Sequence, residues 1–112
     1  NFHGTSTLLN DKVETLAVKQ TFNGKALSIP CSSTKSMVGH PQGASGALGV
    51  TVSALSLKNG FMTPTINMET PDPECDMDYI SNVGREKSLD IAISNCISFG
   101  SKNSSIVLKR FE

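Results

Sequence analysis

The stretch that decides the fold is Ser32–Gly49, which reads Ser-Ser-Thr-Lys-Ser-Met-Val-Gly-His-Pro-Gln-Gly-Ala-Ser-Gly-Ala-Leu-Gly. It carries a lysine, Lys35, and a histidine, His40, and an apolar pattern with helical spacing follows directly. Gly39 and Pro41 flank the histidine, and both residue types disfavour a position in the middle of a helix. We therefore expect a shaped loop that delivers His40 to the start of a buried helix.

The helix that follows is predicted over residues 43–58. Its apolar positions fall on more than one helix face, which is typical of a buried helix. Asn59-Gly60 predicts its end. Its small residues lower helix propensity, so they indicate the close approach of another backbone. These residues are Gly43, Ala44, Gly46 and Ala47.

Upstream, Asp11 with Glu14 three residues later predicts a helix start. Asp11 would be the N-cap, and Glu14 would reach back to the backbone amide of the cap. Asn23-Gly24 predicts the end of this helix. The remaining elements expected are a short buried strand at 26–31, an irregular surface connection at 62–78, a short strand at 79–83, and an antiparallel pair at 89–97 and 105–111. Helix, strand, buried helix and strands in this order predict an α/β layered arrangement with a mixed sheet.

Length and charge limit the classes of function. The 112 residues suffice for one domain with one core. Lysine and arginine number 10, and aspartate and glutamate also number 10, so the chain has no net field that would attract nucleic acid or an anionic membrane. We expect no membrane span and no amino-terminal signal peptide, since the longest mostly apolar run is short and interrupted by hydroxyl residues.

The cysteines Cys31, Cys75 and Cys96 are odd in number and widely spaced. They form no Cys-x-x-Cys motif, and no nearby pair of histidines completes a zinc site. We expect reduced, mostly buried thiols, a cytosol-like compartment and no bound metal.

Two loop histidines, His3 and His40, are the strongest candidates for chemistry. The positive end of a helix dipole disfavours imidazolium, so His40 is predicted to be a neutral donor able to polarise a carbonyl oxygen. A single loop histidine is more often merely satisfied by backbone groups. Two interpretations of Lys35 are open. It orients a histidine or binds a carboxylate, or it is a loop lysine exposed to solvent. A capping role alone would explain the presence of Glu14. Phe99 has two interpretations, a residue that gates a pocket or an aromatic residue that anchors a hairpin.

Other catalytic classes have little support in the sequence. There is no Gly-x-Ser-x-Gly elbow of a serine hydrolase, and Gly43–Ala47 lacks the Gly-Lys-Ser/Thr ending of a phosphate-binding loop. A metal-dependent hydrolase using His3 and His40 would need a ligand-spaced pair such as His-x-x-x-His, which the sequence does not contain.

With these residues in view, the chain resembles the carboxy-terminal half of a β-ketoacyl-acyl-carrier-protein synthase, an elongating condensing enzyme of the thiolase-like superfamily. The resemblance covers essentially the whole chain, and the two histidine motifs together are highly specific. The matching stretches are Asn1–Thr7, Asn10-Asp11 with Glu14, Ser33–Met37, Gly39-His40, Gly43-Ala44, Pro64–Asn67, Pro71, Ser94-Asn95, Phe99-Gly100 and Asn103.

The resemblance implies a thiolase-like layered α/β fold and an acyltransferase activity, the decarboxylative Claisen condensation of fatty-acid or polyketide synthesis. A cysteine holds the acyl chain, and the carbanion from malonyl carrier protein attacks that thioester. By this resemblance His3 and His40 are the catalytic histidines, and Lys35 is a catalytic lysine that Glu14 pairs with and orders.

The same resemblance assigns substrate contacts and partners. Thr5 and Thr7 would hydrogen-bond the pantetheine arm, and Phe99 would gate the acyl pocket. The expected partners are acyl carrier protein, malonyl and acyl thioesters, the amino-terminal half of the enzyme and a second copy in a homodimer. No cofactor is expected beyond the phosphopantetheine of the carrier. The expected location is the cytoplasm, or the matrix of a plastid, apicoplast or mitochondrion.

The sequence departs from the family in two respects. None of its cysteines matches the nucleophile motif, which belongs to the amino-terminal half, so residues 1–112 are expected to be a carboxy-terminal domain that cannot run the cycle alone. The family's Gly-Phe-Gly-Gly-Thr/His-Asn loop reads Ser98–Asn103 here, and serine for glycine restricts positive φ and the mobility of the gate. A non-catalytic relative, such as a chain-length-factor-like subunit that shapes a pocket and binds a partner, is the alternative.

Overall fold

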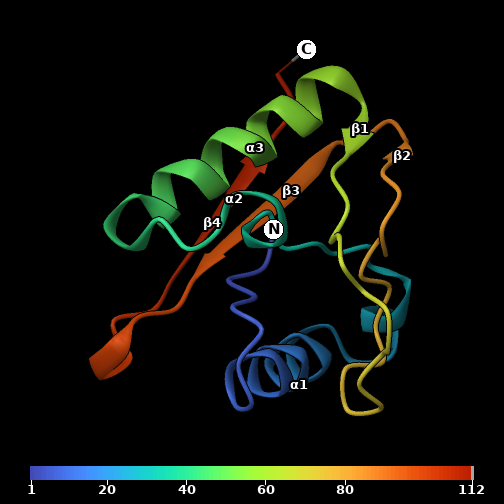
Figure 1. Cartoon of the computed structure of the whole chain (residues 1–112). Helices are drawn as coiled ribbons and strands as arrows, with labels where there is room; N and C mark the ends of the chain where they lie inside the picture. The colour runs from blue at the N-terminus through green and yellow to red at the C-terminus, as the bar shows by residue number, and fades with distance from the viewer. Residues whose placement is uncertain (112) are drawn as a thin grey trace.

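The computed structural model describes residues 1–111, and Glu112, the last residue of the predicted domain, lies outside them. It is an α/β fold, as predicted, in which helices and strands alternate with irregular segments (Figure 1). The elements are α1 (Asn10–Phe22), η1 (Asn23–Ser28), α2 (Lys35–Val38), η2 (Gln42–Ala44), α3 (Ser45–Asn59), β1 (Phe61–Met62), β2 (Arg85–Glu86), β3 (Ile91–Cys96), η3 (Phe99–Ser101) and β4 (Ser104–Lys109).

The predicted antiparallel pair near the carboxyl end is confirmed. Strands β3 and β4 pair from Ile91 opposite Lys109 to Cys96 opposite Ser104. Helix α3 packs across this hairpin, as Figure 1 shows for the green helix over the orange and red strands. The smaller sheet, β1 with β2, is also antiparallel. The expected mixed sheet was therefore wrong for the described residues, whose only parallel pairing is the isolated bridge between Thr65 and Ser81.

The amino-terminal segment extends the hairpin and connects it to the rest of the fold. The Asn1 backbone nitrogen donates to the Ile93 carbonyl at 2.6 Å, and the Asn95 amide donates to the Asn1 carbonyl at 2.9 Å. The Phe2 amide then donates to the Ser32 carbonyl at 2.8 Å. Residues 1–2 therefore lie between β3 and residue 32, which places the stretch after them at the centre of the molecule (Figure 1).

Three sequence predictions were wrong in detail. Helix α1 begins at Asn10 without a side-chain cap, because the Glu14 side chain turns to the amides of residues 3 and 4 instead of its own helix start. Residues 26–28 belong to the 3₁₀ helix η1, since a short apolar run does not distinguish a buried strand from a buried helical turn. The strand expected at 79–83 is absent from the described chain because Ile80 and Asn82 adopt φ of 50° and 62°, which interrupt an extended backbone.

Helix α3 has the predicted carboxyl end, but it begins at Ser45 because residues 43 and 44 belong to η2, and it lacks the predicted burial. It ends where Gly60 adopts φ 63° and its amide donates to the Ser56 carbonyl. Only one stripe of the helix is buried, and Leu55 is 50% exposed, because the hairpin covers a single face. The buried stripe consists of Ser45, Gly49, Ser53 and Leu57.

The close backbone approach expected at Gly43 and Gly46 does not occur there, and the tightest contact of this helix is instead between Gly49 and a side chain. A Cβ added at Gly49 would lie 2.5 Å from the Ser94 Oγ of β3, whereas a Cβ at Gly43 would meet nothing within 4 Å. The absence of a side chain at Gly49 therefore sets how closely α3 packs on β3.

The core within the described residues is small and the surface is large. Four buried apolar residues, Phe2, Ala26, Cys31 and Met77, form the main cluster, with Val18, Phe22 and Tyr79 packed against it. The accessible surface is 7355 Å², whereas a monomer of this mass would have roughly 5,900 Å². Several large apolar side chains are more than half exposed: Leu8, Leu9, Val38, Val83, Ile91 and Val107.

Two further expectations concern the connection and the membrane. The stretch from residue 63 to 78 is irregular, as predicted, apart from a single bridge between Thr65 and Ser81. Among residues 1–111 no helix is long and apolar enough to cross a membrane.

The packing at Gly49 predicts that the effect of Gly49→Ala on stability changes sign with the residue at position 94. Gly49→Ala should destabilise the chain by about 1–3 kcal/mol, because the new methyl group overlaps Ser94. In a Ser94→Ala background the same change should stabilise by about 1 kcal/mol, since the hydroxyl is gone and alanine is the better helix former. Urea unfolding of the full polypeptide that carries these residues, followed by circular dichroism, measures both values.

The matched control is Gly46→Ala in the same helix, where an added Cβ would lie 4.0 Å from the Cys96 Sγ. It should stabilise in both backgrounds. An equal effect of Gly49→Ala with and without the Ser94 hydroxyl would contradict this account of the packing.

Candidate active site

His3 directly follows residues 1–2 and is 6% exposed. Its ring lies against that of His40, with centroids 5.4 Å apart and planes at 81°. The two histidines, 37 positions apart in the sequence, therefore form one pair, which was the strongest expectation from the sequence.

His40 lies in the loop between α2 and η2 and is exposed on the surface of the described residues. Its Nδ1 accepts the backbone N–H of Gln42 at 3.1 Å, and the Ser45 hydroxyl lies 3.1 Å from the same atom. Because Nδ1 accepts a backbone proton donor, the proton of the neutral ring is on Nε2. The loop therefore presents His40 as an Nε2–H donor, the role predicted for it.

Lys35 lies at the start of α2 and connects to the histidine pair. Its Nζ donates to the His3 carbonyl at 2.6 Å and lies 3.5 Å from the His3 Nδ1. Burial lowers the pKa of the Lys35 ammonium. Of the two readings of this residue, the lysine that orients a histidine is the one that the structure supports.

The environment of His3 favours its neutral form. Burial is the main cause that lowers the pKa of the His3 imidazole, and the nearby Lys35 and His40 lower it further. Asp11 acts in the opposite direction. His3 is therefore held as a neutral ring that can donate or accept one hydrogen bond.

Glu14 lies in α1, its side chain contacts the backbone of residues 3 and 4, and it is 2% exposed. Its Oε1 accepts the His3 amide at 2.8 Å and the Asn95 Nδ2 at 3.1 Å, and its Oε2 accepts the Gly4 amide at 3.0 Å. The expected pairing with Lys35 was wrong: none of the ion pairs within residues 1–111 joins these side chains. Both carboxylate oxygens are occupied by N–H donors, and Glu14 meets Lys35 only through the backbone of His3.

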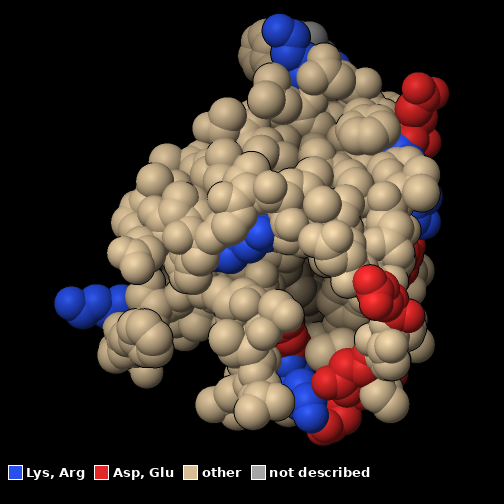
Figure 2. Space-filling model, in the orientation of Figure 1, with Lys and Arg blue, Asp and Glu red and all other residues tan. Residues whose placement is uncertain are grey.

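Thr5 and Thr7 line a hollow of about 700 Å³, whose lining includes neither His3 nor His40. Their hydroxyl oxygens are 3.0 Å apart, and Lys35 also lines the hollow. Figure 2 shows this face hollowed near its middle, with basic atoms above the hollow and acidic atoms beside and below it. These two threonines therefore lie where a ligand in the hollow would pass.

Phe99 is not brought to the histidines within the described structure. It lies in η3 at the tip of the hairpin, is 103% exposed and lines neither described hollow. In the same loop Gly100 and Ser101 have φ of 75° and 61°. The serine at position 101 therefore adopts the left-handed conformation that glycine would favour, contrary to the restriction expected from the sequence.

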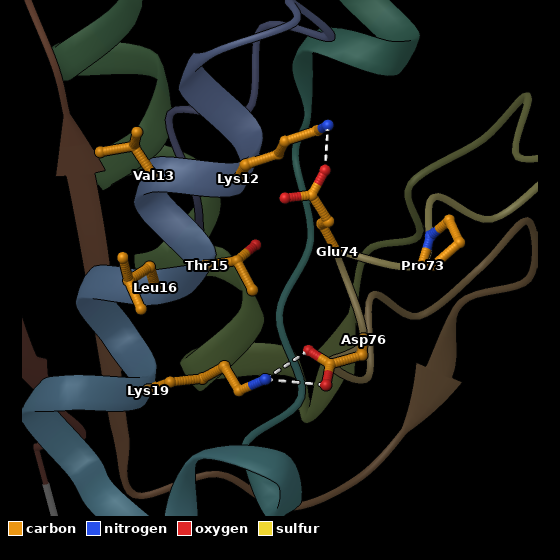
Figure 3. Close-up of a pocket in the computed structure, with 8 residues that line it drawn as sticks. All are labelled: Lys12, Val13, Thr15, Leu16, Lys19, Pro73, Glu74 and Asp76. Atoms are coloured by element: carbon orange, nitrogen blue, oxygen red, sulfur yellow. Dashed lines mark hydrogen bonds and ion pairs between the residues drawn. The ribbon is translucent and has the colours of Figure 1, made fainter.

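A second hollow, of about 310 Å³, lies between α1 and residues 73–76, away from the histidines. Figure 3 shows two lysines of α1 reaching across it to two acids, Lys12 to Glu74 and Lys19 to Asp76. Exposed pairs of this kind contribute little to stability, because water and salt screen the charges. The two ion pairs across this hollow connect α1 to the irregular segment at residues 73–76.

Sequence reasoning missed three side chains that hold the site. The Ser33 Oγ donates to the Gly4 carbonyl at 2.6 Å, and Asp11 accepts the Thr5 amide at 3.1 Å. The third is Asn95, which donates to Glu14 from β3. The spacing of Asp11 and Glu14 placed both on one helix face, but nothing local in the sequence indicated that Asn95 reaches α1.

The cysteines and possible metal ligands complete the inventory. Burial raises the pKa of the Cys31 thiol to about 12, so this sulfur stays protonated and is a poor nucleophile. All three cysteines are free. Within residues 1–111 no group of three or more His, Cys, Asp or Glu side chains is arranged to hold a metal ion.

Known proteins resemble this chain closely in sequence. The family model described as "Beta-ketoacyl synthase, C-terminal domain" matches residues 1–69. The chain is 46% identical over 110 residues to 3-oxoacyl-[acyl-carrier-protein] synthase 2 of Coxiella burnetii, covering 98% of this chain and 27% of that protein. It is also 46% identical over 110 residues to the tetracenomycin polyketide synthase ketoacyl synthase alpha subunit of Streptomyces glaucescens, covering 98% of this chain and 26% of that protein.

Solved structures agree in fold. A type II polyketide synthase acyl carrier protein in complex with its ketosynthase superposes with a TM-score of 0.97 at 37% identity, covering 100% of this chain and 28% of that chain. The ishigamide ketosynthase/chain length factor gives 0.95 at 33% identity, with 100% and 27% covered. A β-ketoacyl synthase from Burkholderia phymatum gives 0.91 at 37% identity, with 98% and 26% covered. These neighbours have the thiolase-like fold that was predicted, and the chain spans about a quarter of their length.

The contact between Lys35 and His3 makes a prediction. Lys35→Met should raise the pKa of His3, because a cation beside the ring disfavours imidazolium and its removal relieves that effect. A pH titration of the histidine ring signals by NMR measures the shift.

Lys58→Met, at the exposed end of α3, is the matched control and should leave the His3 titration in place. An unchanged His3 titration in Lys35→Met would show that the lysine charge does not act on this ring.

Proposed function

The chain belongs to the β-ketoacyl synthase family through its carboxy-terminal domain, and from that premise we propose that it supplies the two histidines of a decarboxylative condensing site. The activity proposed is that of a 3-oxoacyl-[acyl-carrier-protein] synthase, an acyltransferase of fatty-acid or polyketide synthesis. The observation that carries the proposal is the pairing of His3 with His40 beside Lys35.

The chemistry requires hydrogen-bond donors at the place where negative charge develops. In the proposed step the bond between the malonyl carboxylate and Cα breaks, carbon dioxide leaves, and the electron pair moves to the thioester oxygen as an enolate. A neutral imidazole with its proton on Nε2 stabilises that oxygen, which is the form that the Gln42 contact gives His40. His3, whose pKa is lowered by burial, is held neutral for the same task.

The condensation then needs an acyl thioester on a cysteine. The enolate carbon attacks the acyl carbonyl carbon, a new carbon–carbon bond forms, and the cysteine thiolate leaves. Cys31 is unsuited to this role because burial keeps its thiol protonated. Since the chain spans 27% of its curated relatives, we assign the nucleophile to the portion of those proteins outside the matched region.

The proposal extends to partners. Acyl carrier proteins deliver the malonyl and acyl groups, and Thr5 and Thr7 hydrogen-bond the pantetheine arm in the hollow that they line. A neighbouring structure that contains a ketosynthase with its acyl carrier protein supports this assignment. The working enzyme is proposed to be a homodimer without a bound cofactor or metal, located in the cytoplasm or an organelle matrix.

A second candidate is a non-catalytic subunit of the same family. The similarity to a ketosynthase/chain length factor assembly favours it, as do the serines at positions 98 and 101 of the hairpin tip. The retained pair of His3 and His40, with Lys35 in contact, supports the enzyme more strongly. The two candidates differ in whether the protein releases carbon dioxide from a malonyl thioester.

The central test measures that release in the full polypeptide that carries these residues. His3→Ala and His40→Ala should each lower the rate of carbon dioxide release from malonyl carrier protein by about 100-fold or more, the usual cost of losing a donor to developing charge. Lys58→Ala, at the exposed end of α3 and outside the hollow, is the control and should act as the unsubstituted protein does. A protein without decarboxylase activity would favour the non-catalytic subunit.

The large apolar surface makes a separate prediction about assembly. Residues 1–112 expressed alone should aggregate or unfold over a broad transition, and co-expression with the remaining part of the enzyme should give a soluble complex, because the surface exceeds that of a monomer of this mass. Size-exclusion chromatography and thermal unfolding measure both. A monodisperse monomer with a sharp transition would contradict the assembly.

A further inference from the structure

Asn95 occupies a place in the site that neither the motifs nor the proposed mechanism explains. It lies on β3, opposite Ser105 of β4, and its side chain is half-buried. The Ser105 Oγ donates to the Asn95 Oδ1 at 2.8 Å, and the Asn95 Nδ2 donates to the Glu14 Oε1 at 3.1 Å. Because the serine donates to the oxygen, the amide nitrogen is directed to the carboxylate.

Glu14 connects Asn95 to His3, the catalytic candidate. The same Oε1 accepts the His3 amide at 2.8 Å, while Oε2 accepts the Gly4 amide at 3.0 Å. The His3 carbonyl, on the other side of that residue, accepts from Lys35 at 2.6 Å. A line of hydrogen bonds therefore runs from β4 through β3 and α1 to the backbone of His3.

The carboxylate at the middle of this line depends on its donors for orientation. Glu14 is 2% exposed, so solvent does not replace a lost hydrogen bond readily. Without Asn95, the Oε1 atom would keep only the His3 amide. Rotation of the carboxyl group toward another partner would then shift the His3 amide and with it the ring. The backbone at Gly4 has φ 36° and touches Ser33, so a shift there is transmitted to the loop.

We infer that Asn95, with its orientation set by Ser105, is a positioning residue for His3 that acts through Glu14. The inference rests on the proposed decarboxylation. We call the hydrogen bonds from Ser105 through Asn95 to Glu14 the Ser105–Asn95–Glu14 relay. In this inference Asn95 sets the position of the His3 ring, whereas a purely structural Asn95 would only connect β3 to α1.

The test uses the full polypeptide and four single variants. Asn95→Ala removes both contacts, and Ser105→Ala removes only the contact that orients the amide. Asn95→Asp keeps the size of the side chain but replaces the N–H donor by a carboxylate facing Glu14. The matched control is Asn82→Ala, which removes two hydrogen bonds to the Met68 backbone outside the relay.

We expect Asn95→Ala to lower kcat for carbon dioxide release by about 10–100-fold with little change in KM, as expected for a small displacement of a reacting group. Ser105→Ala should have a smaller effect of the same kind. The double variant of the two should lose no more than Asn95→Ala alone, because both changes interrupt the same line.

The pH profile of Asn95→Asp is the readout that a merely structural role would not move. Near neutral pH two carboxylates would face each other, and the kcat loss should exceed that of Asn95→Ala. As pH falls from about 8 to about 6, the rate relative to the unsubstituted protein should recover, because a proton shared by two close carboxyl groups restores an O–H donor to Glu14. The relative rate of Asn95→Ala should stay constant over this range. The titratable and charged groups that face this part of the site are Asp11 and Glu14 of α1, Lys35 of α2, the thiols of Cys31 and of Cys96 on β3, and the rings of His3 and His40.

The outcomes separate the inference from the proposed function. An unsubstituted protein that releases no carbon dioxide would overturn both the proposed function and the positioning role that rests on it. An active protein in which Asn95→Ala and Asn95→Asp behave as Asn82→Ala does, with lower stability but unchanged kcat, would overturn the positioning role alone. A pH-dependent recovery in Asn95→Asp, absent from the other variants, supports it.

Discussion

The buried carboxylate of Glu14 is the interaction on which the rest of the site depends. It accepts hydrogen bonds from the N–H groups of His3 and Gly4, near the amino terminus, and of Asn95 in β3. Glu14 itself lies in α1. A carboxylate in this position replaces water for backbone amides that would otherwise be buried without partners. It also joins α1 and the hairpin to a single short stretch of backbone.

That stretch is short, and hydrogen bonds from several sides define its position. Residues 1–2 are bonded to β3 on one side and to residue 32 on the other, and the Lys35 ammonium donates to the His3 carbonyl. The ring of His3 is thus held against His40 by backbone contacts on both of its flanks. A ring held in this way agrees with the electrostatic preorganisation that the proposed decarboxylation would require.

The packing of α3 on β3 places the second histidine. Gly49 lets the helix approach Ser94 closely, and the start of the same helix carries Ser45, whose hydroxyl lies beside the His40 ring. The outer face of α3 and part of the hairpin remain open in the described residues. The arrangement therefore resembles one layer pair of a larger layered protein, as the coverage of about a quarter of its relatives also indicates.

The sequence by itself determined the features that depend on local chemistry. Asn59-Gly60 ended α3 because glycine adopts the left-handed conformation, and alternating apolar residues near the carboxyl end formed the β3–β4 hairpin. The histidine motifs, met together, indicated the condensing site. Only the tertiary structure decided which partner each polar side chain takes. Glu14 has the spacing of a capping box, yet it turns to backbone amides that folding brings from eleven residues away, and Asn95 reaches it from across the fold. Local pattern does not specify such contacts, because the free energy of a buried carboxylate is set by whichever donors surround it after the chain has folded.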